Sequence, residues 1–179
     1  ARVGPLLDTL QESRALYDDD KENITPELGA RFWLIHTFAH VLMRQLSLQS
    51  GYSSASLRER LFVGNHPDAA NGLLIYTASP DSDGTLGGLQ RLGEIRRFEP
   101  IVRQALAGIA WCSSDPLCIE GLSAASEPSN LAACHSCVLA SETSCEEFNQ
   151  FLDRALLVGT PDEPGLGFFS GLTTGVESD

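Results

Sequence analysis

The chain has 179 residues, 42% of them hydrophobic, so it is long enough to bury one compact core and short for two. Its formal net charge of −12, from 24 acidic and 12 basic side chains, opposes direct binding to a phosphate backbone, which requires clustered Lys and Arg. The sequence contains no run of about 18 apolar residues, and it therefore predicts no membrane-spanning helix.

The cysteines indicate the redox environment. All 5 of them lie after residue 111, and we expect no signal peptide from the residues at the start of the sequence. An odd number of cysteines in such a chain favours thiols in a reducing cytoplasm over a disulfide framework. Because the sequence lacks an initiator Met, we also expect it to be part of a longer protein.

The first half of the chain contains the clearest helix. Residues 1–24 are expected to form a short amphipathic helix and an acidic linker. A long helix then begins where Thr25 can act as the cap and Pro26 occupies the first helical position, and it ends at Gly51. Because it is apolar on nearly every side, we expect this helix in the middle of the core.

Two predicted strands and two further helices follow. The strands lie around residues 61–63 and 73–76, and the second leads into a turn-rich segment that becomes helical near residue 86. A helix is expected over residues 98–112, with Trp111 on its apolar side. Another is expected over residues 144–158, where Ser144 and Glu147 have the spacing of a capping box.

These elements predict an α+β domain over residues 25–160. We expect a small central β-sheet of two to four strands, flanked by helices, and a Cys-rich, zinc-stapled helical C-terminal part. Residues 161–179 are rich in Gly and Pro and are expected to form a tail that is poorly ordered alone.

The segment CHSC separates Cys134 and Cys137 by two residues, a spacing at which both thiolates can face one metal ion. Together with Cys145 they are the firmest candidate ligands, and Cys118 is the expected fourth. Cys112 is the alternative fourth, because it falls on the apolar end of the preceding helix. Zinc is the expected structural cofactor, although the spacing also suits an iron–sulfur cluster.

Two other uses of the cysteines stay open at this point. A thioredoxin-like redox pair normally follows a strand and begins a helix, whereas the residues before CHSC are predicted to be loop. Plain buried thiols are the other alternative. Neither explains the grouping of several cysteines as simply as a structural metal site does.

A second group of candidate residues lies earlier in the chain. His36 and His40 are one helical turn apart, a spacing that can hold a metal, but the glutamate of the His-Glu-x-x-His protease signature is missing. Buried core histidines are the simpler interpretation. A hydrolase or nuclease that uses these histidines with Asp81 or Asp83 is the alternative.

The order of these segments resembles a known family. HTFAHVLMRQLSLQSGY, GLLIYTASPDSDGTLGGL, WCSSDPLCIE and ACHSCVLASETSCEEFNQFLDRALL are together similar to the helicase-associated zinc-binding domain that follows the motor in Mrf-type and Hrq-type helicases. The resemblance covers roughly residues 30–158. Within this family it is strongest to the version in DrmB-type subunits of the DISARM bacteriophage-defence system.

The resemblance implies a function that the residues alone do not. It implies a non-catalytic accessory domain of an anti-phage defence complex, which docks on a helicase-like DrmA-type subunit and reaches DNA mainly through that partner. The sequence contains no motor motif, so no ATPase activity is assigned to it. The long approach from Cys112 to CHSC departs from the helicase pattern, and this departure leaves the fourth zinc ligand open.

Overall fold

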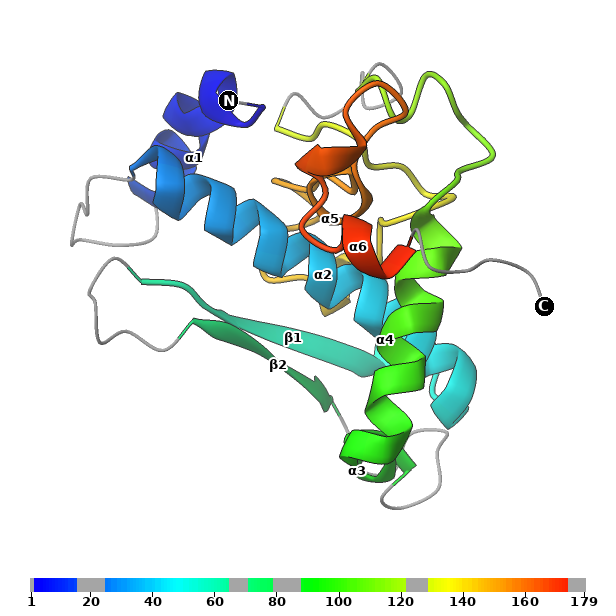
Figure 1. The fold of residues 1–179 in the computed structure, drawn as a ribbon. Helices are drawn as coiled ribbons and strands as arrows, with labels where there is room; N and C mark the ends of the chain where they lie inside the picture. Colours follow the sequence, from blue (N-terminus) through cyan, green and yellow to red (C-terminus); the bar gives the residue numbers. More distant parts are fainter. Residues whose placement is uncertain (1, 16–24, 65–70, 79–87, 122–128, 174–179) are drawn as a thin grey trace.

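The structure is a computed structural model that describes residues 2–15, 25–64, 71–78, 88–121 and 129–173. Helices pack on one face and at the ends of a two-stranded antiparallel sheet, which confirms the predicted α+β class (Figure 1). Asp81 and Asp83 lie outside the described residues. The principal elements are α1 (Leu7–Ala15), α2 (Pro26–Ser50), β1 (Leu57–Phe62), β2 (Gly72–Thr77), α3 (Gly88–Leu92), α4 (Ile95–Ile109), α5 (Ala155–Val158) and α6 (Ser170–Thr173).

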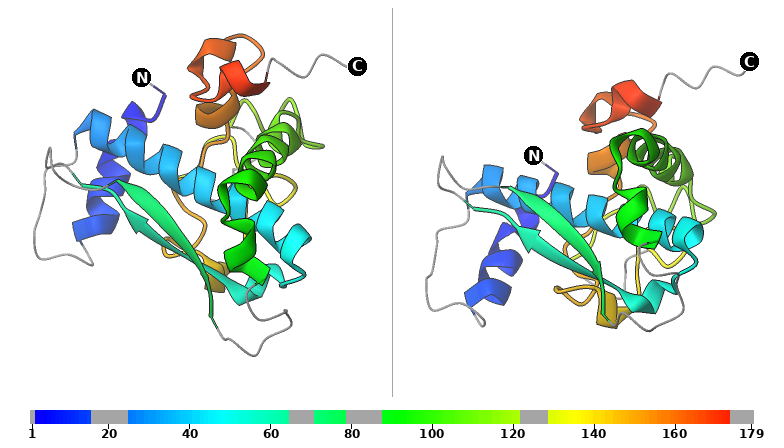
Figure 2. Two further views of the ribbon diagram at one scale, coloured as in Figure 1. Left: turned by 60° about the horizontal axis from the view of Figure 1, so that its bottom comes forward. Right: turned by 90° about the horizontal axis from the view of Figure 1, so that it is seen from below.

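Helix α2 is the central element of the fold, as its sequence predicts. Its first turn is capped by Thr25, whose hydroxyl accepts a hydrogen bond of 3.2 Å from the amide of Leu28. Its last turn is followed by Gly51 at φ 77°, a left-handed conformation that glycine adopts without steric cost. Figures 1 and 2 show α2 lying between the β-hairpin on one side and the C-terminal segment on the other.

The sheet covers one side of α2. Strands β1 and β2 pair antiparallel, from Leu57 opposite Thr77 to Phe62 opposite Gly72. Alternation along β1 points Leu57, Glu59 and Leu61 toward the helix. The opposite face of the hairpin is open, and its exposed apolar side chains are Phe62, Leu74 and Tyr76.

Helix α4 packs across the C-terminal half of α2 and completes the main core. Its buried side chains Ile101, Ala105, Leu106 and Ile109 recur at helical spacing. The helix begins and ends three residues earlier than expected. Trp111 therefore lies beyond its end, where 71% of the side chain is exposed instead of packing in the core.

A smaller apolar cluster joins the two ends of the domain. Val3 and Leu10 from the N-terminal segment pack against Phe32 and Trp33 of α2 and against Phe151. The rings of Trp33 and Phe151 meet edge to face, with their centroids 5.2 Å apart. The N-terminal segment with α1 is therefore part of the core.

The helix expected over residues 144–158 is wrong over most of its length. Residues 142–144 form a 3₁₀ turn, Cys145 is extended, and only Ala155–Val158 is α-helical. Phe148, Asn149 and Phe151 have positive φ angles, which break any helix. Side-chain bonds replace the helical ones: the Asn149 amide group binds both backbone groups of Ala140 at 2.9 Å.

The described part of the predicted tail folds back onto the domain. The amides of Phe168 and Phe169 each donate a 2.9 Å hydrogen bond to a carbonyl of α5, and the Phe169 ring lies 5.1 Å from that of Phe38. The glycines serve close packing here, because a Cβ on Gly167 would collide with the backbone of Gly159. Among the described residues, no helix is both long and apolar enough to cross a membrane.

The contact between α2 and α4 generates a stability prediction. Replacing Leu106, whose side chain is 1% exposed, by Ala leaves a cavity in the main core. We expect Leu106→Ala to lower the free energy of unfolding by about 2–5 kcal/mol in chemical denaturation. Leu48→Ala is the matched control, because the Leu48 side chain is 74% exposed, and it should change that free energy by less than about 0.5 kcal/mol.

Candidate metal centres

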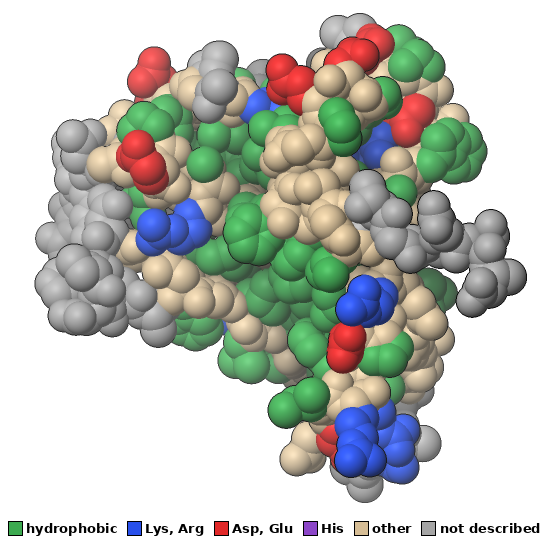
Figure 3. Space-filling model, in the orientation of Figure 1, with side chains coloured by type: hydrophobic (Ala, Val, Ile, Leu, Met, Phe, Trp, Pro, Cys, Tyr) green, Lys and Arg blue, Asp and Glu red, His purple; other side chains and the backbone are tan. Residues whose placement is uncertain are grey.

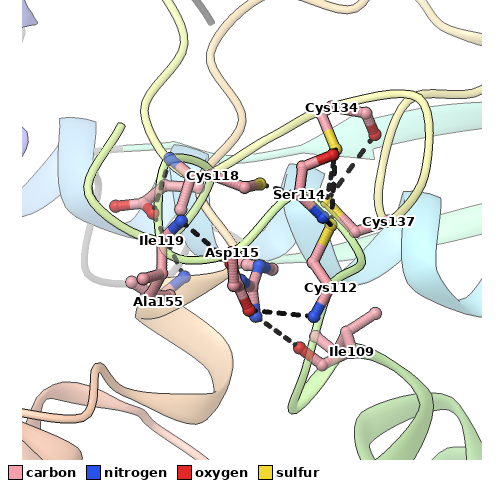
Figure 4. A network of polar contacts seen from close by, with 12 residues as sticks. Ile109, Cys112, Ser114, Asp115, Cys118, Ile119, Cys134, Cys137 and Ala155 are labelled. Carbon is pink, nitrogen blue, oxygen red and sulfur yellow. Dashed lines mark hydrogen bonds and ion pairs between the residues drawn. The ribbon is translucent and has the colours of Figure 1, made fainter. Parts of the chain in front are cut away.

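Four cysteines converge from two segments of irregular structure. Cys112 and Cys118 lie in the turns that follow α4, and Cys134 and Cys137 lie in the CHSC turn (Figure 4). Their sulfur atoms all lie within 4.8 Å of one another. We call Cys112, Cys118, Cys134 and Cys137 the four-cysteine cluster.

The spacing of the sulfur atoms fits a tetrahedral zinc site. The Sγ–Sγ distance is 3.5 Å from Cys112 to Cys134, 3.7 Å from Cys118 to Cys137 and 3.6 Å between the two cysteines of CHSC. Zn–S bonds of ~2.3 Å place tetrahedral sulfurs about 3.8 Å apart. A metal ion with four thiolate ligands therefore fits this cluster without a large movement of the chain.

Electrostatics also favour a cation at this position. Burial raises the pKa of the Cys137 thiol, and the charges of Cys118 and the other neighbouring cysteines raise it further. Burial alone would also raise the pKa of Cys134, but hydrogen bonds from Cys112 and from the amide of Ser136 bring it down to about 7. Several thiolates this close together repel one another unless a positive ion neutralises them.

Asp115 fixes the first cysteine turn. Its carboxylate accepts hydrogen bonds of 2.9 Å from the amide of Cys112 and 3.1 Å from the amide of Ile119, and it forms an ion pair with the buried guanidinium of Arg154. Arg154 also donates a 2.8 Å bond to the carbonyl of Ile109 at the end of α4. This network, drawn in Figure 4, ties the turn that presents Cys112 and Cys118 to the C-terminal segment.

The CHSC turn is fixed from the other side by α2. Arg44 donates hydrogen bonds of 2.7 Å and 2.8 Å to the carbonyls of Ser136 and Cys137. Within the turn, the amide of Cys137 bonds to the carbonyl of Cys134 at 3.1 Å. His135 is exposed.

Cys145 does not join the other cysteines in the structure. It lies with His36, His40 and Glu59, and the candidate ligand atoms of these four residues are within 4.8 Å of one another. Cys112, the alternative fourth ligand, occupies the place in the four-cysteine cluster that was expected for Cys145. The reason is that the helix expected from residue 144 does not form. The turn after Cys145 instead directs its sulfur toward α2.

We call His36, His40, Glu59 and Cys145 the histidine cluster. All four side chains are buried. Burial is the main influence that lowers the pKa of His36 and that raises the pKa of the Cys145 thiol. Burial also opposes ionisation of Glu59, but the hydrogen bond with His36 and the proximity of His40 outweigh it and hold the pKa of that carboxyl below its ordinary value.

The sequence contained an unused signal for Glu59. The alternation Leu57, Glu59, Leu61 places this carboxylate on the apolar side of β1, where a charged residue requires a partner. The histidines one turn apart on a buried helix provide that partner. Combining these two observations would have identified three members of the histidine cluster, whereas Cys145 depends on an irregular turn.

Comparison with known proteins identifies the family. A family model described as the MrfA Zn-binding domain matches residues 38–138, a range that includes the whole four-cysteine cluster and ends before Cys145. The chain belongs to the MrfA Zn-binding domain family. Family membership and the four-cysteine cluster together support zinc as its structural cofactor.

One relative adds a biological context. The chain is similar to "DISARM protein DrmB" of Bacillus paralicheniformis (strain ATCC 9945a / NCIMB 11709 / CD-2), with 46% identity over 144 residues. The match covers 78% of this chain but 24% of that protein. The chain therefore corresponds to a part of this relative.

A cysteine replacement tests the four-cysteine cluster. We expect Cys112→Ser to weaken zinc binding strongly and to lower the free energy of unfolding by several kcal/mol, since structural zinc contributes on the order of 10 kcal/mol to folding. Zinc release to a chromophoric chelator and chemical denaturation measure the two effects. The control is His135→Ala inside the CHSC turn, and an equal loss of zinc from both variants would contradict the assignment.

Asp115 provides a second test that leaves every sulfur in place. Asp115→Ala removes the acceptor for the amides of Cys112 and Ile119, so the turn no longer holds its two thiols in position. We expect zinc affinity to fall by about 10–100-fold in a competition titration with a chelator. Asp162→Ala, at an exposed position, is the matched loss of a carboxylate and should leave the affinity unchanged.

Proposed function

We propose that the chain is a non-catalytic accessory domain of an anti-phage defence complex. In this proposal it docks on a helicase-like, DrmA-type ATPase subunit and supports the engagement of DNA by that subunit. The observation that carries the proposal is the 46% identity to the DISARM protein DrmB across most of the chain. Membership of a zinc-binding family named after MrfA supports it.

The four-cysteine cluster has a structural role in this proposal. Cys112, Cys118, Cys134 and Cys137 would hold one zinc ion through four protein ligands, which leaves no coordination position for a substrate or water. The zinc would fasten the turns after α4 to the CHSC turn on α2. Its contribution is then the shape of the surface that the domain presents to its partner.

One surface beside the zinc cluster suits a docking partner. Trp111 lies next to Cys112 and borders a hollow of about 480 Å³, whose other lining residues include Pro116, Val158 and Pro161. Leu117 is also largely exposed nearby. Tryptophan is enriched among the residues that dominate binding energy at protein interfaces, particularly beside pockets. We place the contact with the helicase-like subunit here.

Charge supports a protein partner over direct contact with DNA. The net charge of −12 repels phosphate and favours a basic protein surface. Arginines gather at one corner, near the start of α4 (Figure 3). Arg97 pairs with Glu94 at this corner, and Arg103 pairs with Glu99 further along α4, so part of the positive charge of this helix is neutralised. DNA is therefore reached mainly through the partner in this proposal.

The hydrolase or nuclease alternative is weaker on geometry. His36 and His40 are 0% and 1% exposed, and each faces Glu59 instead of an accessible surface. A hydrolytic site requires a position for water and substrate. The other residues of that hypothesis, Asp81 and Asp83, lie outside the described part of the chain.

Replacement of Trp111 tests the docking surface. We expect Trp111→Ala to weaken binding to the helicase-like subunit by about 30-fold or more, which corresponds to a loss of roughly 2 kcal/mol. Isothermal titration calorimetry with the purified partner measures this change. Zinc content and thermal unfolding of the variant should match the parent chain, because the Trp111 side chain is exposed.

Leu48→Ala is the control for this experiment, since Leu48 is equally exposed but lies at the end of α2. It should bind the partner as the parent chain does. Unchanged binding by Trp111→Ala would move the docking surface elsewhere. Tight, salt-dependent binding of the isolated chain to duplex DNA would contradict the view that DNA is reached through the partner.

A further inference from the structure

The histidine cluster brings four electron-pair donors to one buried point. Nε2 of His36 lies 3.1 Å from Oε1 of Glu59 and 3.2 Å from Sγ of Cys145. Nε2 of His40 lies 3.4 Å from the same carboxylate oxygen. Ligands bound at ~2.0–2.3 Å around a tetrahedral zinc ion lie about 3.3–3.8 Å apart, so an ion at the centre requires these atoms to move apart by only a few tenths of an ångström.

The orientation of His40 directs a ring nitrogen that can bind a metal ion toward Glu59. Nδ1 of His40 lies 3.0 Å from the carbonyl of Val138, which accepts but cannot donate, so Nδ1 carries the proton. In the neutral imidazole Nε2 then holds a lone pair. This buried Nε2 has no hydrogen-bond partner among the described residues, and neither does Oε2 of Glu59. Metal-bound histidines typically donate their second ring N–H to such a carbonyl.

The sulfur of Cys145 has the surroundings of a ligand thiolate. It accepts hydrogen bonds of 3.3 Å from the amide of Glu147 and 3.2 Å from the amide of Asn149. Both donors come from the turn whose positive φ angles replace the expected helix. Backbone amides directed at a sulfur stabilise its anionic form, which is the form that binds metals.

A neighbouring glutamate fastens the Cys145 turn to the hairpin. Glu146 accepts a 2.9 Å bond from the amide of Leu61 and pairs with Arg60 at 2.7 Å. Its own amide lies 3.3 Å from Oε1 of Glu59. The positions of Cys145 and Glu59 are therefore fixed relative to each other by bonds outside the cluster, as in a preformed site.

We propose that His36, His40, Glu59 and Cys145 bind a second structural metal ion, a divalent cation of the zinc class. One thiolate and one carboxylate neutralise the two positive charges of the ion, so the site has no net charge in a fully buried position. Imidazole and thiolate ligands select zinc over magnesium or calcium. The ion joins α2, β1 and the Cys145 turn, which the four-cysteine cluster does not connect.

The metal content of the full chain tests this proposal without any substitution. Protein purified under reducing conditions with zinc is expected to contain about two zinc ions per chain by inductively coupled plasma mass spectrometry, one for each cluster. X-ray absorption at the zinc edge is expected to show, averaged over both ions, about 2.5 sulfur and about 1.5 nitrogen or oxygen ligands. A single zinc ion per chain with only sulfur ligands would overturn the proposal.

Variants assign the second ion to its ligands. His40→Gln is expected to lose about one zinc ion per chain and to leave an all-sulfur absorption spectrum. Cys112→Ser is expected to lose the other ion and to retain the mixed spectrum. The control His135→Ala removes an exposed histidine and should keep both ions. Retention of two ions by a folded His40→Gln variant would also overturn the proposal.

These measurements distinguish failure of the second metal site from failure of the four-cysteine site or of the docking surface. If His40→Gln does not fold, the zinc count and absorption spectrum of the unsubstituted chain still decide. One ion with a mixed ligand set would support the histidine cluster and contradict the four-cysteine assignment. Loss of partner binding by Trp111→Ala concerns the docking surface alone and leaves this result unaffected.

Discussion

The position of two irregular segments is the constraint on which the rest of this domain depends. Residues 110–121 and 129–153 contain no α-helix or β-strand in the structure, so helical or sheet hydrogen bonds do not hold them in place. Side chains perform much of that task, together with backbone bonds such as the one from the amide of Leu131 to the carbonyl of Leu152. The four-cysteine cluster joins the two segments, and Asp115 with Arg154 connects the first of them to the C-terminal part. A domain built in this way requires its metal for its shape and not only for added stability.

Helix α2 connects both clusters. One turn presents His36 and His40 to the histidine cluster, and the next turn directs Arg44 at the carbonyls of the CHSC turn. A long, buried and well-capped helix is a suitable support because it changes little when its surroundings move. The clusters thus share a rigid support while they fasten different segments to it, and each can be altered without removing the other's ligands.

Local signals in the sequence predicted the regular elements well. Thr25, Pro26 and Gly51 defined α2, and the apolar run before the turn-rich segment defined β2, because caps and periodicity act within a few residues. Cys134 and Cys137, the expected zinc ligands of CHSC, lie in one tight turn, because their two-residue spacing is also a local signal. The spacing of the cysteines did not decide that Cys112 belongs to the cluster in place of Cys145. Its position depends on where α4 ends and on the direction of the turn after it.

Long-range contacts overrode the local signals elsewhere. The capping-box spacing at Ser144 predicted a helix, but Asn149 and the amides that bind Cys145 favour a turn. Trp111 matched the apolar spacing of α4, yet the helix ends before it. The inward position of Glu59 was visible in the alternation of β1, whereas its approach to Cys145 depends on tertiary structure that no local pattern encodes.

The ion pair between the two ends of the domain has a consequence for where the chain can be shortened. Arg2 bonds to Asp153 at 2.6 Å, and this carboxylate is fully buried next to Arg154. A fragment that begins at the cap of α2 would lose Arg2 and leave the Asp153 charge buried without its cation, a costly arrangement. It would also uncover Trp33 and Phe151 to water. The first helix is therefore an integral part of the folding unit, and a minimal zinc-binding fragment needs to include it.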